Sequence, residues 1–348
     1  MRYSDHSRFR HISCALLGVA LFTAASARAQ FTYSTISDPA GTSTWCQGVS
    51  NGTVFGHYLD SSGNGNGFIY SGGTFTKLDD PYAYGQFGTQ PAGISGSTIV
   101  GTYQDIRTGT VRGFIDNGGS FTPLDDPSAA GTTIITGISG NNMVGYYEDS
   151  SDAWHGFEYN DSTSVFTTLD DPLRTSSNPK TDAMGIDGNT IVGWYIGASN
   201  SAGSETHGFS YNNSTYTSFD IPETTTSGTT TDPQSTTATG ISGSLIVGNA
   251  YIEFITKTGT GFNVTADDFG FLYDGSNFTL LGVPDAGSQY PYETYAEAID
   301  GSTVVGYYYV NYDTVEGFET TVPEPANMML LLGGAGFLMR RRRNSARN

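Results

Sequence analysis

Residues 93–127 read GISGSTIVGTYQDIRTGTVRGFIDNGGSFTPLDDP, and four short phrases in this stretch decide the fold. The phrases are Gly-Ile-Ser-Gly, Ile-Val-Gly-x-Tyr, Gly-Phe and Phe-Thr-x-Leu-Asp-Asp-Pro. Each is a run of β-branched, aromatic or small residues bounded by Gly, Asn, Asp or Pro, which is the pattern of a short strand between turns. The stretch therefore predicts four consecutive strands.

The same phrases recur along the chain, and their spacing predicts the architecture. The Gly-Phe pair occurs six times, beginning at Gly67, Gly113, Gly156, Gly208, Gly270 and Gly317. Consecutive pairs are 43 to 62 residues apart. Four-stranded units of about this length are typical of β-propeller blades. We therefore predict an all-β fold, a six-bladed β-propeller of four-stranded blades.

The residue types of each phrase indicate its place in a blade. Gly-Ile-Ser has the smallest side chains, which favours the crowded innermost strand. Ser71-Gly72-Gly73 and Asn117-Gly118-Gly119 are typical of hairpin turns between the third and fourth strands. Asp-Asp-Pro ends the fourth strand, because Pro cannot donate to a ladder and Asp favours turns.

The two ends of the repeat region predict how the ring closes. The last copy, from about Tyr295 to Thr321, stops after its Gly-Phe strand and lacks a fourth phrase. Residues 31–39, FTYSTISDP, read as a fourth strand without a blade. We expect residues 31–37 to pair with residues 317–321, so that the N-terminal strand completes the last blade and covers an open sheet edge.

Composition and charge restrict the class of partner. Aromatic residues make up 13% of the chain, which is typical of a folded protein because disordered chains contain few of them. Between positions 30 and 321 there are 32 acidic and six basic residues, a formal charge of about −26. Such a charge repels nucleic acid and anionic lipid. It favours either solubility outside the cell or the binding of cations.

Residues 1–29 are predicted to be an export signal peptide. Arg2, Arg8 and Arg10 precede an apolar run over residues 12–25, which is short for a membrane span. Ala27 and Ala29 form the small-x-small pattern of signal cleavage. We expect Sec-dependent export, and the alternative is a short membrane anchor.

Residues 322–348 form three parts in a fixed order. Val322, Pro323, Glu324 and Pro325 are followed by an apolar run over residues 326–339 and then by Arg340, Arg341, Arg342 and Arg343. An apolar segment enters the inner membrane as a transmembrane helix, and the arginines stop transfer on the cytoplasmic side. The order resembles the PEP-CTERM sorting signal of Gram-negative bacteria. The resemblance implies processing by an exosortase and a secreted or cell-envelope location with transient anchoring. A permanent anchor is the alternative.

Two copies of the third phrase carry a second resemblance. His155-Gly156-Phe157 and His207-Gly208-Phe209 resemble the namesake segment of the HAF-type extracellular repeat family, with Gly in place of Ala. The resemblance implies an exported repeat protein on residues 30–321, and it supplies no catalytic residues.

A search for chemistry leaves no catalytic and no metal-binding residue to assign. Asp79-Asp80, Asp125-Asp126 and Asp170-Asp171 recur at one repeat position, which favours a turn requirement over paired-carboxylate catalysis. His155 and His207 are repeat-equivalent and are expected on neighbouring blades, in strand-end packing. Cys46 is expected to be a small buried residue. We predict no cofactor, with Ca²⁺ at the oxygen-rich residues 60–66 as a weak alternative.

Two functions remain open at this point. The first is a non-enzymatic structural or binding module of the cell surface or extracellular matrix, with extracellular polysaccharide as a candidate partner. The second is a carbohydrate-active hydrolase or lyase on the same scaffold, since a propeller hosts both. An enzyme should gather non-repeated acids, His or Arg at one mouth of the channel. Two insertions break the symmetry: residues 224–237, expected to be a loop, and residues 252–268, expected to lengthen a hairpin.

Overall fold

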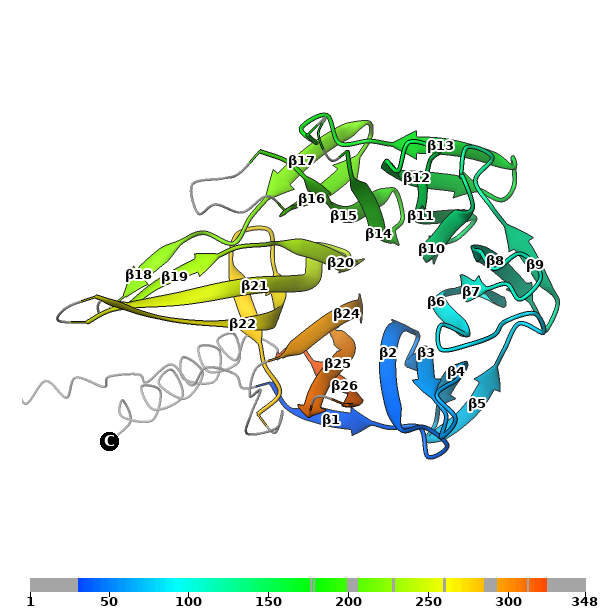
Figure 1. The fold of residues 1–348 in the computed structure, drawn as a ribbon, viewed down its shortest axis with the longest axis horizontal. Helices are drawn as coiled ribbons and strands as arrows, with labels where there is room; N and C mark the ends of the chain where they lie inside the picture. The colour runs from blue at the N-terminus through cyan, green and yellow to red at the C-terminus, as the bar shows by residue number, and fades with distance from the viewer. Residues whose placement is uncertain are drawn as a thin grey trace, which may run out of the picture. The chain divides into compact units, whose positions relative to one another are not determined.

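The computed structural model describes residues 31–323, apart from 176, 178, 199–205, 227–228, 259–260, 285–292 and 312. These residues form six antiparallel sheets arranged around a central axis, as Figure 1 shows. The all-β, six-bladed propeller with four-stranded blades is therefore confirmed. Within the described part of the chain, no helix is long and apolar enough to cross a membrane.

Blades 1 to 4 have strands that follow chain order outward from the axis. Blade 1 contains β2 (Ser43–Ser50), β3 (Thr53–Leu59), β4 (Gly65–Ser71) and β5 (Thr74–Leu78). Blade 2 contains β6 (Thr89–Ser95), β7 (Thr98–Gln104), β8 (Val111–Asn117) and β9 (Phe121–Leu124). Blade 3 contains β10 (Thr132–Ser139), β11 (Asn142–Glu148), β12 (Trp154–Asn160) and β13 (Val165–Leu169). Blade 4 contains β14 (Thr181–Asp187), β15 (Thr190–Ile196), β16 (Thr206–Asn212) and β17 (Thr215–Phe219).

Blade 5 carries an arm that projects from the disc (Figure 1). Its strands are β20 (Thr237–Ser242), β21 (Leu245–Lys257), β22 (Phe262–Tyr273) and β23 (Phe278–Leu281). The hairpin of β21 and β22 is lengthened over residues 252–268, as predicted. The loop predicted over residues 224–237 is wrong in part: β18 (Thr224–Thr226) and β19 (Thr229–Pro233) extend the sheet beside β21. The threonine-rich composition favours strand once an open edge is available to pair with.

Blade 6 is completed by the N-terminal strand. It contains β24 (Thr294–Asp300), β25 (Thr303–Asn311), β26 (Thr314–Thr321) and, on its outer edge, β1 (Tyr33–Ile36). Tyr33 lies opposite Thr320 and Ile36 opposite Gly317, which is the predicted closure. The Tyr33 and Phe318 rings meet edge to face, 5.4 Å apart. The chain thereby covers the edge that would otherwise remain open.

The Gly-Phe phenylalanines fill the space between blades. Each is fully buried: Phe68, Phe114, Phe157, Phe209, Phe271 and Phe318 have no exposed surface. The tyrosine that ends Ile-Val-Gly-x-Tyr is also buried in blades 1 to 4 and 6. Blade-to-blade burial of these aromatic side chains supplies most of the hydrophobic driving force for the ring.

The innermost strand of every blade contains a β-bulge at the same repeat position. The bulged residue lies one place before the glycine or alanine of the first phrase, and in the six blades it is Gln47, Ala92, Thr136, Met184, Thr239 and Glu297. Opposite the bulge lies the glycine of Ile-Val-Gly. A Cβ on Gly145 would lie 2.0 Å from the carbonyl oxygen of Ile134, so this position accepts only glycine.

We expect Gly145→Ala to lower the free energy of unfolding by about 3 kcal/mol, because the added methyl group overlaps backbone that cannot move without breaking the ladder. Urea unfolding followed by tryptophan fluorescence measures the change. Gly261→Ala is the matched control, since a Cβ there meets no atom within 4 Å. Equal stability of the two variants would show that the close approach is not a constraint.

The two faces of the disc differ in their connections. One face, here called the turn end, carries the short turns between first and second strands and the hairpins between third and fourth strands. The other face, here called the loop end, carries the longer connections within and between blades. Tyr33 and Val322 both lie at the turn end, where the Val322 amide donates to the Ser302 carbonyl at 2.7 Å.

Deletion of β1 tests the closure of the ring. Removing Tyr33–Ile36 exposes the edge of β26 and part of the core around Phe318, so we expect aggregation and loss of a cooperative melting transition. Deletion of Thr224–Thr226 is the control, because β18 is also an edge strand but is fully exposed. Unchanged melting after loss of β1 would contradict the closure.

Candidate functional site

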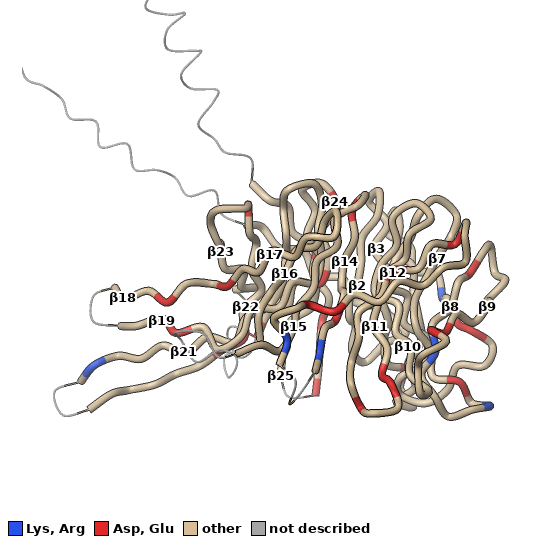
Figure 2. Tube along the Cα trace, turned by 90° about the horizontal axis from the view of Figure 1, so that it is seen from above, with Lys and Arg blue, Asp and Glu red and all other residues tan. Residues whose placement is uncertain are grey.

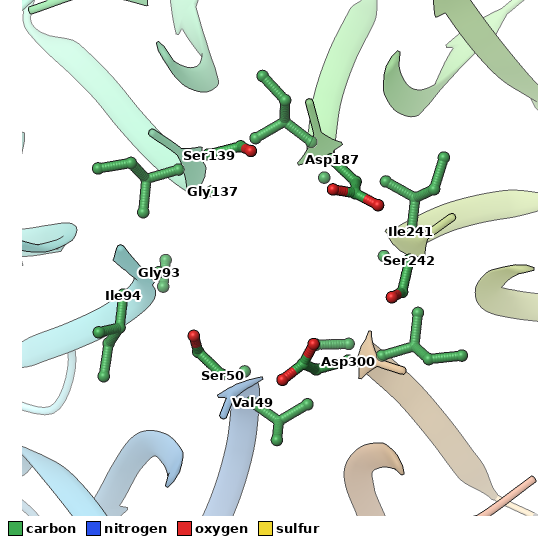
Figure 3. Close-up of a pocket in the computed structure, with 18 of the residues that line it drawn as sticks. Val49, Ser50, Gly93, Ile94, Gly137, Ser139, Asp187, Ile241, Ser242 and Asp300 are labelled. Carbon is green, nitrogen blue, oxygen red and sulfur yellow. The ribbon is translucent and has the colours of Figure 1, made fainter. Parts of the chain in front are cut away.

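The turn end of the channel is ringed by the last residues of the six innermost strands. These residues are Ser50, Ser95, Ser139, Asp187, Ser242 and Asp300, and several point toward the axis in Figure 3. Five of them accept a hydrogen bond from a turn amide of the next blade. For example, the Gly188 amide donates to Ser139 Oγ at 3.0 Å, and the Asn51 amide donates to Asp300 Oδ2 at 2.6 Å.

This ring is a structural belt rather than a reactive group. Asp187 and Asp300 occupy the position that serine occupies in the other blades. Each accepts a hydrogen bond from a backbone amide in the turn of the next blade, as the bonded serines do. The Asp300 bond joins the last blade to the first and so reinforces the closure by β1. The cavity inside this ring has a volume of about 270 Å³. The residues of its ring are equivalent in the repeat, with serine in four blades and aspartate in two.

The bulged residues form a second ring deeper in the channel, which we call the waist. Gln47, Ala92, Thr136, Met184, Thr239 and Glu297 line both the turn-end cavity and a second cavity of about 180 Å³ on the other side. Thr136 and Thr239 donate to carbonyls of the next blade, at 2.8 and 2.7 Å. Glu297 is the one ionisable side chain of the waist.

Toward the loop end, the second strand of each blade carries the variable residue of Ile-Val-Gly-x-Tyr. In the six blades this residue is His57, Thr102, Tyr146, Trp194, Asn249 and Tyr307. Each pairs across the ladder with a residue of the innermost strand, and in the same order those are Trp45, Gln90, Ile134, Asp182, Thr237 and Tyr295. Thr102, Tyr146, Gln90 and Ile134 line the second cavity, which fixes the orientation of this register position.

All three tryptophans of the chain lie at the loop end. Trp45 stacks on His57 at 4.6 Å between ring centroids. Trp154 lies 5.5 Å from Tyr146, and the Lys180 ammonium sits between Trp154 and Trp194, 4.8 and 4.7 Å from their ring centroids. Such cation–π contacts hold the two indoles in place.

Asp182 is a buried acid beside this aromatic group. Its side chain is 3% exposed, and Lys180 Nζ lies 3.4 Å from Oδ2. The other oxygen, Oδ1, is buried without a hydrogen-bond partner among the described residues. Burial raises the pKa of Asp182 to about 7, and Lys180 opposes this rise only in part. An unpaired buried acceptor is costly, and in a channel wall it points to a ligand or a water.

Blades 5 and 6 together contribute a cluster of tyrosines and acids to the same end. Tyr295 stacks on Tyr307 at 4.9 Å, and Tyr309 meets both rings edge to face. The Tyr295 hydroxyl donates to Asp268 Oδ2 at 2.9 Å. Burial, followed by the neighbouring carboxylates, raises the pKa of Asp267 and of Glu293.

Glu297 is held in the waist by one weak partner. The Asn249 side-chain amide lies 3.5 Å from its Oε1, and burial raises the pKa of Glu297 to about 7. The folded state therefore retains a proton that the unfolded chain releases near pH 4.5. Stability consequently falls as the pH rises from about 4.5 through about 7.

We expect Glu297→Gln to stabilise the protein at pH 8 by an amount on the order of 2 kcal/mol, because the amide has no charge to desolvate. At pH 4.5 the two proteins should have nearly the same stability. Gln is the residue that blade 1 already has at this position, Gln47. Thermal melting across this pH range measures the difference, and a gap that does not depend on pH would refute the assignment.

The repeated acids have the structural role that the sequence predicts. In four connections the second acid, at Asp38, Asp80, Asp126 or Asp171, accepts from the backbone amide two residues later at 2.8 Å. The first acid faces the residue before Gly-Phe. Thus His155 Nδ1 lies 3.0 Å from Asp170, and His207 Nδ1 lies 3.0 Å from Asp220. The two histidines are strand-end pairs on neighbouring blades, as expected.

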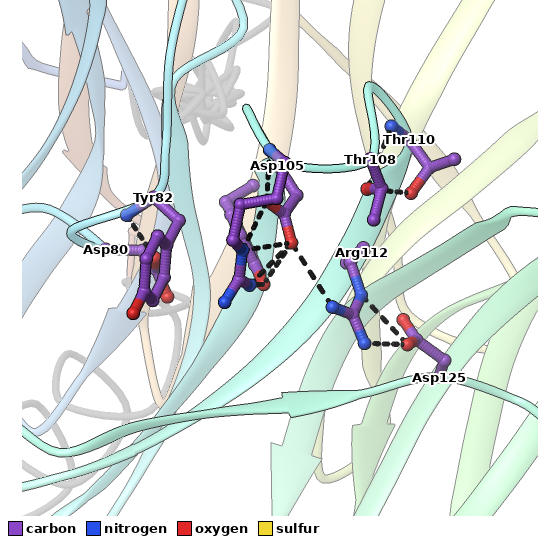
Figure 4. A network of polar contacts seen from close by, with 9 residues as sticks. Asp80, Tyr82, Asp105, Thr108, Thr110, Arg112 and Asp125 are labelled. Atoms are coloured by element: carbon purple, nitrogen blue, oxygen red, sulfur yellow. Dashed lines mark hydrogen bonds and ion pairs between the residues drawn. The ribbon is translucent and has the colours of Figure 1, made fainter.

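Blade 2 replaces the histidine by arginine and builds a larger polar network, shown in Figure 4. Asp105 is fully buried and receives Arg107 Nη2 at 2.6 Å and Arg112 Nη1 at 3.2 Å. Arg112 also pairs with Asp125, and the Arg107 guanidinium lies 3.5 Å above the Tyr82 ring. These bonds hold the pKa of Asp105 well below its usual range. The network ties two loops together and leaves no acid free for catalysis.

The remaining predicted positions have simple environments. Cys46 is fully buried, as expected, and burial raises the pKa of its thiol. In residues 60–66, Asp60 Oδ1 accepts from the Ser62 and Asn64 amides, at 2.8 and 2.9 Å. Among the described residues, no group of three or more His, Cys, Asp or Glu side chains is placed to hold a metal.

Of the sorting residues, the structure describes two, Val322 and Pro323. Val322 packs at the edge of the core of blade 6. Ala27, Ala29, Glu324, Pro325 and Arg340 to Arg343 lie outside the described residues.

Acidic residues are much more numerous than basic ones in the domain, and Figure 2 shows both kinds along the chain. Five of its six basic residues form ion pairs with aspartates: Lys77, Arg107, Arg112, Arg174 and Lys180. With 32 acids in residues 30–321, most carboxylates keep their charge without a basic partner. The domain therefore attracts cations and repels polyanions.

Comparison with known proteins gives structural similarity only. No model of a protein family matches the sequence, and no curated protein matches it. A solved structure of SapL1 lectin in complex with alpha methyl fucoside is 12% identical, with a TM-score of 0.44 over 82% of this chain and 93% of that chain.

Two further structures have similar scores. The fucose-specific lectin from Aleuria aurantia is 10% identical, with a TM-score of 0.39 over 85% of this chain and 97% of that chain. An ulvan lyase bound to -[GlcA(1-4)Rha3S]- is 10% identical, with a TM-score of 0.39 over 80% of this chain and 82% of that chain. Two of the three are lectins and one is an enzyme, and likenesses at this level of identity show the fold alone.

Proposed function

We propose that this chain is an exported, non-enzymatic binding module of the cell surface or extracellular matrix, and that it binds polysaccharide at the loop end of its channel. One observation carries the proposal. The three tryptophans lie at the loop end of their blades, and at the same end two copies of the variable residue, Thr102 and Tyr146, line the second cavity. Aromatic faces with nearby polar groups suit sugar rings, whose C–H faces are apolar and whose hydroxyls need partners.

The chemistry of the channel supports binding over catalysis. His57 bonds to Gln47, Glu297 to Asn249, and Asp182 to Lys180. These ionisable groups are therefore each paired with a different residue, and no acid, base and nucleophile form a bonded set among them.

Export and sorting complete the proposal. The signal peptide directs the chain to Sec, and the tail directs it to an exosortase-type enzyme in the envelope of a Gram-negative bacterium.

Glycan-array binding, followed by titration of the best ligand, tests the site. We expect Trp154→Ala and Trp194→Ala each to weaken binding about tenfold or more, because each removes a face of the aromatic group. Phe262→Ala is the control, since this ring is 71% exposed on the arm and far along β22 from the channel. Binding that depends on Phe262 and not on the tryptophans would place the site on the arm.

A carbohydrate-active hydrolase or lyase is the second candidate, and one observation favours it. Asp182 and Glu297 both have pKa values raised to about 7 by burial, which is a property of general acids. Both carboxylates also act electrostatically on Tyr146. New reducing ends or unsaturated products from a bound polysaccharide would favour the enzyme, and an unchanged polymer would favour the binding module.

A further inference from the structure

We propose that the channel selects ligands carrying a protonated amine, and that Glu297 at the waist is the residue that recognises it. The inference rests on the proposed glycan-binding function and names the ligand class, a polysaccharide with free amino groups. It begins from an asymmetry in the waist. Five blades place an uncharged side chain there, and blade 6 alone places a carboxylate.

The surroundings of Glu297 leave its charge largely uncompensated. Its printed partner is the neutral Asn249 amide, at the long distance of 3.5 Å. Among the described residues, the ionisable groups on which Glu297 acts are two tyrosines, Tyr307 of blade 6 and Tyr146 of blade 3. Tyr146 lines the same cavity as Glu297. Lys180, at the loop end, is paired with Asp182. A ligand cation at the waist would therefore meet a carboxylate whose printed partner is neutral.

Asp182 supplies an independent observation. Its Oδ1 is buried and has no partner among the described residues, although Oδ2 is paired with Lys180. Asp182 occupies the register position of Gln90 and Ile134, which line the cavity. Both Asp182 and Glu297 raise the pKa of Tyr146, so the two carboxylates lie within electrostatic reach of one cavity-lining side chain. An N–H donor from a ligand would satisfy the orphaned oxygen.

These features decide between ligand classes. An anionic sugar would be repelled by the carboxylates and by the charge of the domain. The hydroxyls of a neutral sugar can donate to either carboxylate, but they bring no charge to compensate that of Glu297. A protonated amine on a sugar ring both donates to the carboxylate and compensates its charge in a site of low dielectric, so it is the favoured ligand.

The test compares two probes that differ at the ring nitrogen substituent: a glucosamine oligomer with a protonatable amine and its fully N-acetylated counterpart with a neutral amide, both titrated at pH 6.5 against the full chain in mild detergent. We expect the amine form to bind about tenfold more tightly, and Glu297→Gln to remove this preference while leaving the acetylated form unaffected. The double variant Gln47→Glu/Glu297→Gln returns the charge to the waist from the neighbouring blade. It should restore at least part of the preference. Melting of each variant at pH 6.5 verifies folding.

Each outcome separates this inference from the function on which it rests. Equal binding of both oligomers in a tryptophan-dependent manner would keep the glycan site and overturn amine selection. Binding of a lysine-rich peptide alone, lost in Glu297→Gln, would overturn the glycan function. A preference for the amine form that survives Glu297→Gln would overturn the role of this residue. Binding of neither oligomer, beside tryptophan-dependent binding of another glycan on the array, would overturn amine selection alone.

Discussion

The close approach of two backbones at the bulge is the constraint on which the rest of the propeller depends. In each blade the innermost strand places an extra residue opposite a glycine of the second strand. There, a Cβ would lie about 2 Å from a carbonyl oxygen. The bulge bends the strand around the axis and turns the extra side chain toward the channel. The same constraint thus bends the innermost strands around the axis and places the waist side chains in the channel. The architecture of the ring and the residues that line it therefore depend on one backbone feature.

The constant residues of the repeat determine the fold, and this explains why the fold could be predicted. The glycines and the buried phenylalanines meet local requirements that recur in all six copies, and the Asp-Asp-Pro turns recur in three. The closure could be predicted for the same reason, because residues 31–39 match a phrase missing from the last copy. The arm could not, because threonine-rich residues 224–226 and 229–233 form strands only beside the lengthened β21.

The candidate site could be predicted only in part, since it is built from residues that the repeat does not conserve. The variable position of Ile-Val-Gly-x-Tyr carried a signal: it holds His57, Tyr146, Trp194 and Tyr307 in a phrase that is otherwise apolar. The orientation of this side chain depends on the bulge, and no phrase of the repeat predicts the bulge. The pairing of Trp154 with Lys180 and Trp194 requires a loop of blade 3 to meet blade 4. The sequence does not predict this contact between the two blades.

The pairing of β1 with β26 also determines when folding of the ring can be completed. The first strand of the domain finds its partner some 280 residues later, so the ring stays incomplete until almost the whole chain is present. Such distant pairing makes folding slow. A chain that stops short of β26 leaves β1 without its partner, so a truncated product keeps an open sheet edge in its last blade.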